Sequence, residues 1–394
     1  MFYIFTGIWG SFLMMQKISL SLSFRVLRWC SFFFLVGAWF LVSCAQDVPD
    51  INRVQPRALK KSIFRTTNED GSLREWFFRQ TVVEVPFGTG ATFVGEQTEV
   101  ERVVWEITEQ TLFAYRSYEY VKNSEQKYQR KNVGGFRGAA VAAYRIESHF
   151  DVQRAYNPAT GEQTNVIVEN IADRPWHERK HFRVDFSRNL VTDFRFITST
   201  VKQQPIGYYI PETETKNKDR ARIAEKYIDI VNKVFIQPQI DPDILFYWGE
   251  QFPVCWLYST ITHDCLGQTV KIRSSFLPVT KSQYKGTPYD NRRMDKFGYF
   301  RTLRYSYDPK YGVTEHGTTF QINRWNIWQD VDTCKSSGAT PYSNCKIRQI
   351  PFFLNDLFPT DLKVTARRVV SQWNKIFREL VKKVSGRDQG DVLI

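Results

Sequence analysis

The sequence predicts a mainly β protein of the α+β class: an antiparallel β-rich sandwich or meander domain, followed by a strand and one long C-terminal helix. Three observations support this prediction. Segments rich in β-branched and aromatic residues are separated by turns that contain Gly, Asn and Pro. Hydrophobic residues in 101–107 occur at nearly every second position, as in a strand with one buried face. The sequence lacks the alternation of strand and helix patterns that a nucleotide-binding fold would show.

The predicted strands follow one another in the first half of the chain. Segments 81–87, 101–121, 139–156 and 164–171 are rich in Val, Ile, Thr and aromatic residues. Segment 211–237 is ambiguous, because its apolar residues have helical spacing although half of residues 227–236 are β-branched. We expect a helical or irregular start there, followed by a strand.

The last fifty residues have a different character. Segment 345–359 is predicted to form a strand and a turn, and 360–384 one long helix. Thr360 is a candidate N-cap, two basic residues lie in the last turn, and Gly386 is predicted to end the helix. Its predicted apolar stripe consists of Leu362, Ala366, Val369, Val370, Trp373, Ile376, Phe377, Leu380 and Val384.

The N-terminus has the pattern of a bacterial export signal. The first 46 residues contain no Asp or Glu, and three basic residues precede an apolar run over 29–42. The run ends in Leu-Val-Ser-Cys at 41–44, which resembles the lipobox of bacterial lipoproteins. The alternatives are an ordinary signal peptide or an uncleaved anchor with a chance Cys. Met14 or Met15, instead of Met1, would give a more usual signal length.

The lipobox predicts a signal peptide over 1–43, an acylated Cys44 as membrane anchor and a polar tether over 44–61. Ala45 follows the Cys, which by the sorting rule of such lipoproteins points to the outer membrane. The periplasmic or surface orientation stays open.

The chain is strongly basic, with a formal net charge of +13 at pH 7. Cleavage after residue 43 would remove three basic residues and no acidic one, and so leave +10. Such a charge attracts anionic envelope polymers. Because no Lys/Arg-rich run is interleaved with aromatic residues, no specific nucleic-acid partner is predicted.

The cysteines also fit an oxidising compartment. Four of them lie beyond Cys44, and four cysteines allow three pairings. The short spacings favour Cys255 with Cys265 and Cys334 with Cys345. A zinc site is the weaker alternative, because neither pair has the C-x2-C spacing.

His177, Glu178 and His181 spell H-E-x-x-H, which on a helix binds zinc and supplies a general base. In a strand the Cα atoms of the two His residues would lie about 13 Å apart, too far for a common ion. Apolar residues alternate at Phe182, Val184 and Phe186, which predicts a strand from 181 onward, with His181, Arg183 and Asp185 on its solvent face. No metal or other cofactor is therefore predicted; catalysis by Glu178 with zinc on the two His residues is the alternative.

Several long strings resemble the N-terminal part of large surface lipoproteins of the myxobacterial type. They are "CAQDVPDINRVQPRALKKSIF", "VVWEITEQTLFAYRSYE", "VAAYRIESHFDVQRAYNPATGEQTNVIVEN", "DRPWHERKHFRVDFSRNL" and "RWNIW". In these relatives a zincin-like metalloprotease module follows, and 346–394 resembles its first strand and helix. The resemblance implies a β-rich lipoprotein domain over 62–345 and a truncated module that is not catalytic alone, unless a separate chain supplies the rest.

Taken together, we expect an outer-membrane lipoprotein that acts as a binding or structural module. Its expected partners are the membrane, an anionic envelope polymer or another protein. The alternative is a metallopeptidase or one part of a split zincin.

Overall fold

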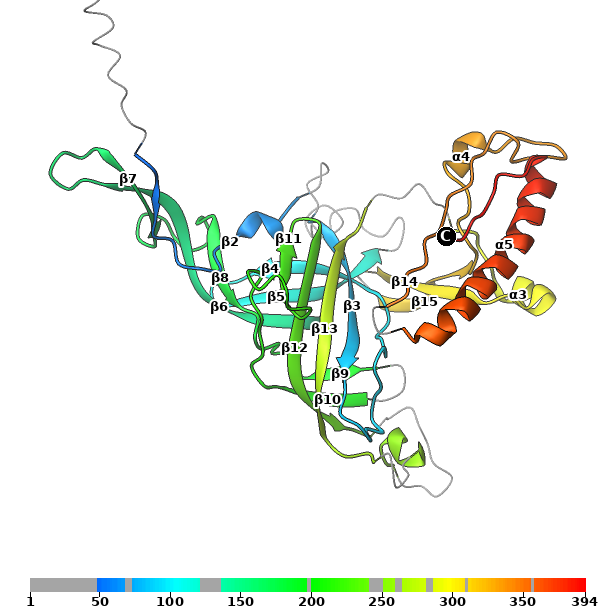
Figure 1. Ribbon diagram of the computed structural model, residues 1–394, viewed down its shortest axis with the longest axis horizontal. Helices are drawn as coiled ribbons and strands as arrows, with labels where there is room; N and C mark the ends of the chain where they lie inside the picture. The colour runs from blue at the N-terminus through cyan, green and yellow to red at the C-terminus, as the bar shows by residue number, and fades with distance from the viewer. Residues whose placement is uncertain are drawn as a thin grey trace, which may run out of the picture. The chain divides into compact units, whose positions relative to one another are not determined.

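The computed structural model in Figure 1 describes residues 48–67, 73–120, 136–196, 200–240, 251–258, 264–280, 286–308, 311–355 and 358–394. The chain divides into two compact units. The first contains the described residues up to Val54 together with 153–168, and the second contains 55–152 and 169–394.

The first unit is built around one parallel strand pair. β1 (Ile51–Asn52) pairs with β7 (Gln163–Asn170), so that Ile51 lies opposite Val166. Arg154 and Asp50 form an ion pair of 2.8 Å, and the side chain of Asn165 donates to the Pro49 carbonyl. Part of the segment expected to be a tether is thus hydrogen-bonded into a strand pair.

The second unit contains an antiparallel sheet, which confirms the predicted mainly β fold. Its strand order is β6-β5-β4-β3-β13-β12-β10-β9. The first four neighbours are a meander of sequence-consecutive strands, and β13 and β12 continue the sheet from β3. The strands are β3 (Glu75–Glu84), β4 (Glu101–Ile107), β5 (Thr111–Tyr120), β6 (Phe136–Tyr156), β9 (Asp193–Arg195), β10 (Thr200–Pro205), β12 (Tyr227–Pro238) and β13 (Gln268–Pro278).

Within the segment predicted as a strand over 101–121, the described residues form two strands, β4 and β5, with a turn at 108–110 that the sequence did not reveal. The turn contains no Gly, Pro or Asn. Instead, the Thr108 hydroxyl donates to the Thr111 carbonyl and accepts from the Thr111 N–H, which closes the hairpin. Hydrogen bonds from a Thr side chain thus stabilise a turn in which Gly, Pro or Asn would more often be found.

Smaller strands are added to this sheet. β2 (Leu59–Lys60) pairs with β8 (His181–Asp185), and β8 pairs with β6. β11 (Arg222–Ala224) pairs with β12, so the ambiguous segment 211–237 has an irregular start without a helix and then two strands. β14 (Arg301–Asp308) and β15 (Gly312–Ile322) form a hairpin, with β14 also pairing with β5.

Aromatic residues fill the core of the sheet. Alternate residues of β3 are buried, and Phe78 packs 4.7 Å from Phe276 between ring centroids. Trp105 packs 4.6 Å from Phe276 and edge-on against Phe64 at 5.1 Å. Phe64 follows the short 3-10 helix η1 (Lys61–Ile63) and also meets Phe182 of β8. The core therefore anchors the two segments that carry the site described below.

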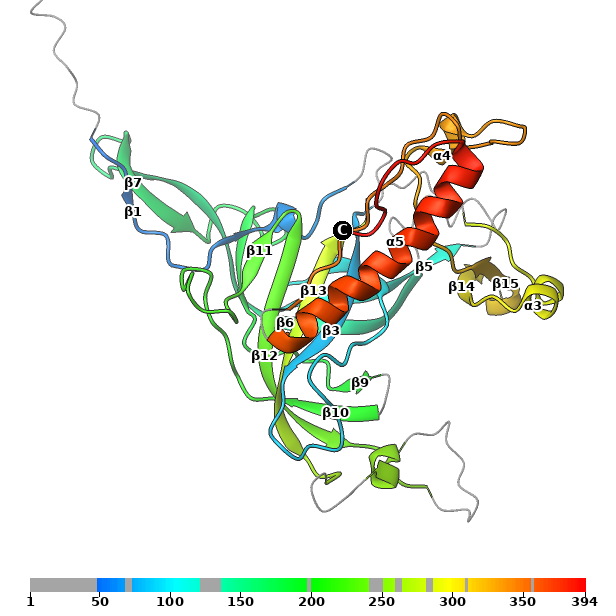
Figure 2. The same cartoon turned by 45° about the vertical axis from the view of Figure 1, so that its right-hand side comes forward.

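The C-terminal segment contains the predicted long helix. α5 (Lys363–Ser385) follows the 3-10 turn η3 (Thr360–Leu362) and ends at Gly386, whose φ of 77° is left-handed. Thr360 does not cap α5, because it begins η3 and the α5 N-cap position has no side-chain hydrogen bond. Figure 2 shows the chain end returning along α5. The strand predicted within 345–359 is not formed by the described residues of this segment, which make only isolated bridges, Ile347 to Trp328 and Ile350 to Leu393.

Of the nine residues in the predicted apolar stripe of α5, only Val370, Phe377 and Val384 pack in the C-terminal core. Phe377 and Val381 pack in a small core with Val392, Leu393 and the disulfide-bonded Cys345. The other helices outside the core sheet are short: η2 (Val254–Tyr258), α3 (Asn291–Phe297) and α4 (Val331–Cys334).

Candidate anion-binding pocket

The H-E-x-x-H segment lies in a turn and a strand. Residues 176–178 form a turn, in which Glu178 N–H donates to the Pro175 carbonyl at 3.0 Å. His181 then begins β8, opposite Phe150 of β6 and Lys60 of β2. The predicted strand from 181 onward is confirmed.

The two His side chains have different surroundings. His177 is exposed, and its Nε2 lies 3.8 Å from a carboxylate oxygen of the exposed Glu178. His181 is half-buried and stacks on Phe150. Burial lowers the pKa of His181, Asp151 opposes this shift, and Lys60 adds to it. In the described part of the chain, no group of three or more His, Cys, Asp or Glu residues is arranged to hold a metal ion.

The prediction that Arg183 faces solvent is wrong. Phe182 and Val184 are buried as expected, but Arg183 is also only 6% exposed. Its guanidinium lies over the Phe150 ring and forms an ion pair with Glu169. The alternation identified one buried face of β8 and could not show that the other face is covered as well.

A pocket of about 420 Å³ opens beside this turn. It is formed by η1 and its flanks together with the segment that leads into β8, which the pairing of β2 with β8 brings together. Its walls include five cationic side chains, two His residues and an apolar surface. The lining residues are Lys60, Lys61, Ser62, Arg65, Ile107, Trp176, His177, Arg179, Lys180 and His181.

Two of the pocket cations, Lys61 and Arg179, are held by neutral groups. Lys61 Nζ donates to the Trp176 carbonyl and lies 5.6 Å from the centroid of the Trp176 ring. Arg179 donates to the carbonyls of Arg174 and His149, at 2.6 and 3.1 Å. Among the described residues none of the five pocket cations forms an ion pair, and the lining contains no carboxylate.

The carboxylate of Asp151, next to the pocket, is already paired. Asp151 forms a 2.6 Å ion pair with Arg174 and accepts the Lys180 N–H at 2.9 Å. Burial would raise the pKa of Asp151, but these hydrogen bonds bring it below its ordinary value. Asp151 is therefore a stable anion that is already paired outside the pocket lining.

Burial and the neighbouring positive charges both act on the pKa of Lys61. Burial, and then the neighbouring charges of Arg179 and Arg65, lower its pKa to about 8, although Asp151 opposes the shift. Two segments, 60–65 and 176–181, thus hold like charges close together in a half-buried site. A ligand with negative charge would relieve this repulsion.

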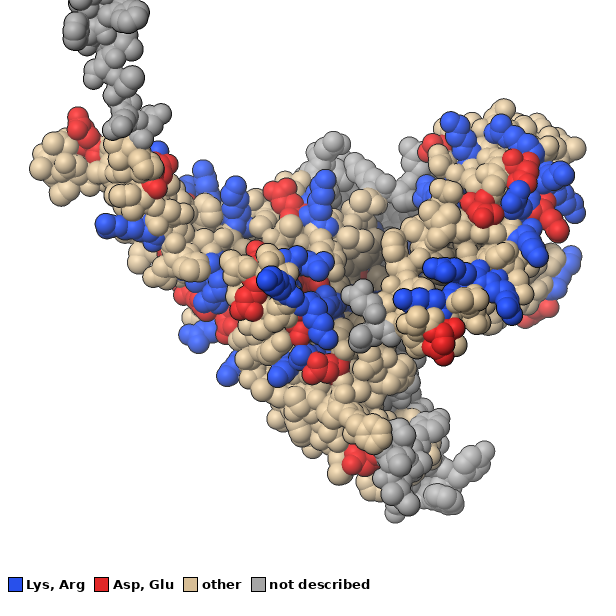
Figure 3. Space-filling model, viewed as in Figure 1, with Lys and Arg blue, Asp and Glu red and all other residues tan. Residues whose placement is uncertain are grey.

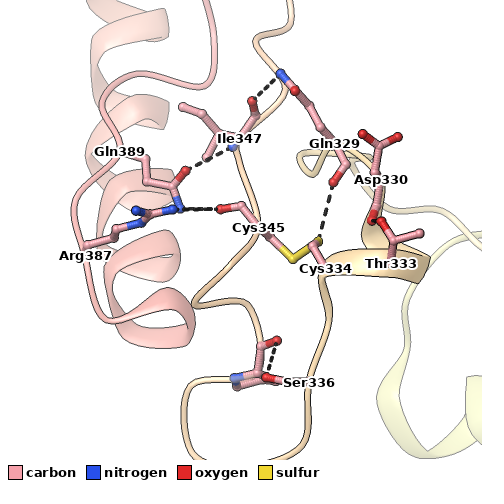
Figure 4. The surroundings of a disulfide bond; sticks show 10 residues. Gln329, Asp330, Thr333, Cys334, Ser336, Cys345, Ile347, Arg387 and Gln389 are labelled. Carbon is pink, nitrogen blue, oxygen red and sulfur yellow. Dashed lines mark hydrogen bonds between the residues drawn. A yellow bond between two sulfur atoms is a disulfide. The ribbon is translucent and has the colours of Figure 1, made fainter.

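Both predicted disulfides are present. Cys255 is bonded to Cys265 and Cys334 to Cys345. Figure 4 shows the second bond beside the chain end: Gln389 donates to the Cys345 carbonyl at 3.0 Å and accepts from the Ile347 N–H at 3.1 Å. Cys44, the predicted lipidation site, lies outside the described residues.

On the face drawn in Figure 3, basic and acidic side chains are interspersed over much of the surface. Among the described residues, no helix is both long enough and apolar enough to cross a membrane. No protein-family model, no curated protein and no solved structure matches this chain.

Proposed function

We propose that this chain is a non-enzymatic lipoprotein of the cell envelope whose pocket binds an acidic group of an anionic envelope polysaccharide. One observation carries the proposal: five cationic side chains and no carboxylate line a pocket of about 420 Å³. That volume lies within the range of pockets that hold small ligands. It would suit a carboxylate- or phosphate-bearing sugar unit of a longer chain.

The walls offer two kinds of contact. Lys61 and Arg179 would donate charge-assisted hydrogen bonds to a carboxylate or phosphate. Trp176 and Ile107 supply an apolar wall against which the face of a sugar ring would pack. The basic side chains of the pocket are charged before any ligand binds. They therefore also attract an anionic polymer over a distance comparable to the Debye length.

The proposed location in the cell envelope is based on the sequence. The Leu-Val-Ser-Cys string predicts an acylated Cys44, which would hold the chain at the outer membrane, close to anionic polymers. Substituting Cys44→Ala should abolish acyl labelling and release the protein from membranes. Unchanged labelling would refute the lipid anchor without affecting the pocket.

The pocket is tested by titrating the purified chain with a galacturonic acid oligomer, with a galactose oligomer of the same length as neutral control. We expect heat of binding only with the acidic oligomer, and an affinity that falls as salt is added. The double variant Lys61→Ala/Arg179→Ala should lose binding. Arg145→Ala removes an exposed cation of β6 that does not line the pocket, and should keep it.

Three results would overturn the proposal. The first is equal binding of both oligomers, and the second is binding that survives the double variant. The third is equally tight binding of a single-stranded DNA oligomer, which would reduce the site to a non-selective basic surface.

A further inference from the structure

Helix α5 has a second apolar stripe that is exposed and does not pack in the C-terminal core. The side chains of this stripe expose between 46% and 58% of their surface, apart from the half-buried Ala366. We name it the outer seam; it consists of Leu362, Ala366, Val369, Trp373, Ile376 and Leu380. It lies beside the inner stripe of Val370, Phe377, Val381 and Val384, which packs in the C-terminal core.

The spacing of the outer seam is that of a coiled coil. Its residues are separated by four, three, four, three and four positions, which is a strict heptad pattern over almost the whole helix. Such a narrow seam typically packs against one partner helix, whereas the apolar face of a helix lying on a lipid surface is wider. The uncharged Thr365 and Gln372 border the seam, where a helix on an anionic lipid surface would place cations.

The seam is complementary to itself when two copies run antiparallel. One register places Leu362 opposite Leu380, Ala366 opposite Ile376 and Val369 opposite Trp373, and two-fold symmetry repeats each pair. Every layer then combines a small with a large side chain, or two leucines, as even packing requires. A parallel pair would place Trp373 on Trp373 and Ala366 on Ala366, which alternates crowding with voids.

Charge and area agree with this arrangement. The antiparallel register brings Lys383, the next seam position, within one helical turn of Asp361 of the other copy. The cations Arg368, Lys375 and Lys382 project away from the seam, so two basic chains do not oppose like charges; Figure 3 shows Lys and Arg over the region of α5. The seam residues expose on the order of 500 Å² per copy, so burying them completely in both copies would reach about 1,000 Å², the lower limit for a biological interface.

We propose that two copies of this chain associate through antiparallel pairing of the α5 outer seams. This surface is independent of the pocket, so either proposal can fail alone.

The association is tested by sedimentation equilibrium of the full chain in a mild detergent. We expect a dimer in the micromolar range. Ile376→Lys places an unpaired charge in the seam and should weaken the dimer by roughly a factor of ten or more. The matched control is Val364→Lys, because Val364 is also an exposed apolar residue of α5 and lies outside the seam. It should leave the dimer unchanged.

The orientation is tested by disulfide trapping. A mixture of Leu362→Cys and Leu380→Cys chains should cross-link under mild oxidation, with the linked peptides identified by mass spectrometry. Neither chain alone should link through the new cysteine. Self-linking of an Ile376→Cys chain would show parallel pairing and overturn the proposed register.

Other results would overturn the association itself. They are a monomer at all accessible concentrations, a dimer that Ile376→Lys leaves intact, and a monomer that binds anionic phospholipid vesicles through the same seam. The last result would assign the outer seam to a lipid surface.

Discussion

Arg183 of β8 donates from Nη2 to a carboxylate oxygen of Glu169 at 2.6 Å, and this ion pair joins the end of β7 to β8. The same guanidinium donates to the carbonyls of Pro56 and Gln55, at 2.9 and 3.1 Å. Glu169 in turn accepts the Gln55 N–H at 2.8 Å. The pair thus fixes residues 55–56 just before β2, whose pairing with β8 forms the pocket.

Substituting Arg183→Met should lower the free energy of unfolding by about 3 kcal/mol, because it leaves the Glu169 carboxylate half-buried without its partner. Urea unfolding followed by tryptophan fluorescence would measure the loss. Arg145→Met removes an exposed arginine from the neighbouring strand β6 and should change stability by less than about 0.5 kcal/mol. Equal effects of the two variants would show that the buried pair contributes nothing specific.

The same pair predicts a loss of stability in acid. Burial raises the pKa of Glu169, but the hydrogen bonds from Arg183 and Gln55 outweigh it, so the folded-state pKa lies below the ordinary 4.5. A lowered carboxyl pKa contributes stability above pH 4.5, and this contribution is lost as pH falls through the folded-state value. The stability difference between wild type and Glu169→Gln should therefore be large at neutral pH and shrink in acid. A difference that does not change with pH would contradict this assignment.

Asn374 ties the chain end to α5. Its amide nitrogen donates to the Leu393 carbonyl at 2.8 Å, and its oxygen accepts the N–H groups of Val392 and Leu393. Asn374→Leu keeps the size of the side chain but leaves buried backbone groups unpaired, so the C-terminal core should lose about 3 kcal/mol. Hydrogen exchange at Val392 and Leu393 would report the loss directly. The exposed neighbour Lys375→Leu should leave this exchange slow.

Strands could be predicted where their own residues carry the pattern, as runs of β-branched and aromatic residues between turn-forming residues. Segments 139–156 and 164–171 match β6 and β7 closely. The hairpin within 101–121 was missed because Thr108 closes its turn, and no Gly, Pro or Asn marks the reversal. The helix was predicted in place, but only three residues of its nine-residue apolar stripe, Val370, Phe377 and Val384, pack in the C-terminal core.

The site was less predictable, because it depends on contacts between distant segments. Lys60 and His181 face each other across the pairing of β2 with β8, although 121 positions separate them in the sequence. Both basic clusters, Lys60-Lys61 and Arg179-Lys180, are visible in the sequence. No local sequence pattern indicates that the two clusters lie close together in the fold. The H-E-x-x-H motif suggests a zinc site, whereas the structure places basic side chains around this segment.

If the pocket binds anions as proposed, Lys61 should make that binding sensitive to pH. Because burial and the charges of Arg179 and Arg65 lower its pKa to about 8, its charge is lost as pH rises through that value. Affinity for the galacturonic acid oligomer should therefore fall above pH 8 in the wild type, and Lys61→Met should bind more weakly without this step. Lys60→Met removes a pocket cation but should keep the step.

The same shift has a consequence for stability that does not depend on any ligand. A lysine whose folded-state pKa is lowered disfavours the folded state while it is charged, so stability rises as pH increases from about 8 toward the ordinary 10.5. We expect the difference in unfolding free energy between wild type and Lys61→Met to shift in favour of the wild type over that range, measured by urea unfolding at several pH values. A difference that stays constant over this range would show that the folded-state pKa of Lys61 is not lowered, and would contradict the assignment.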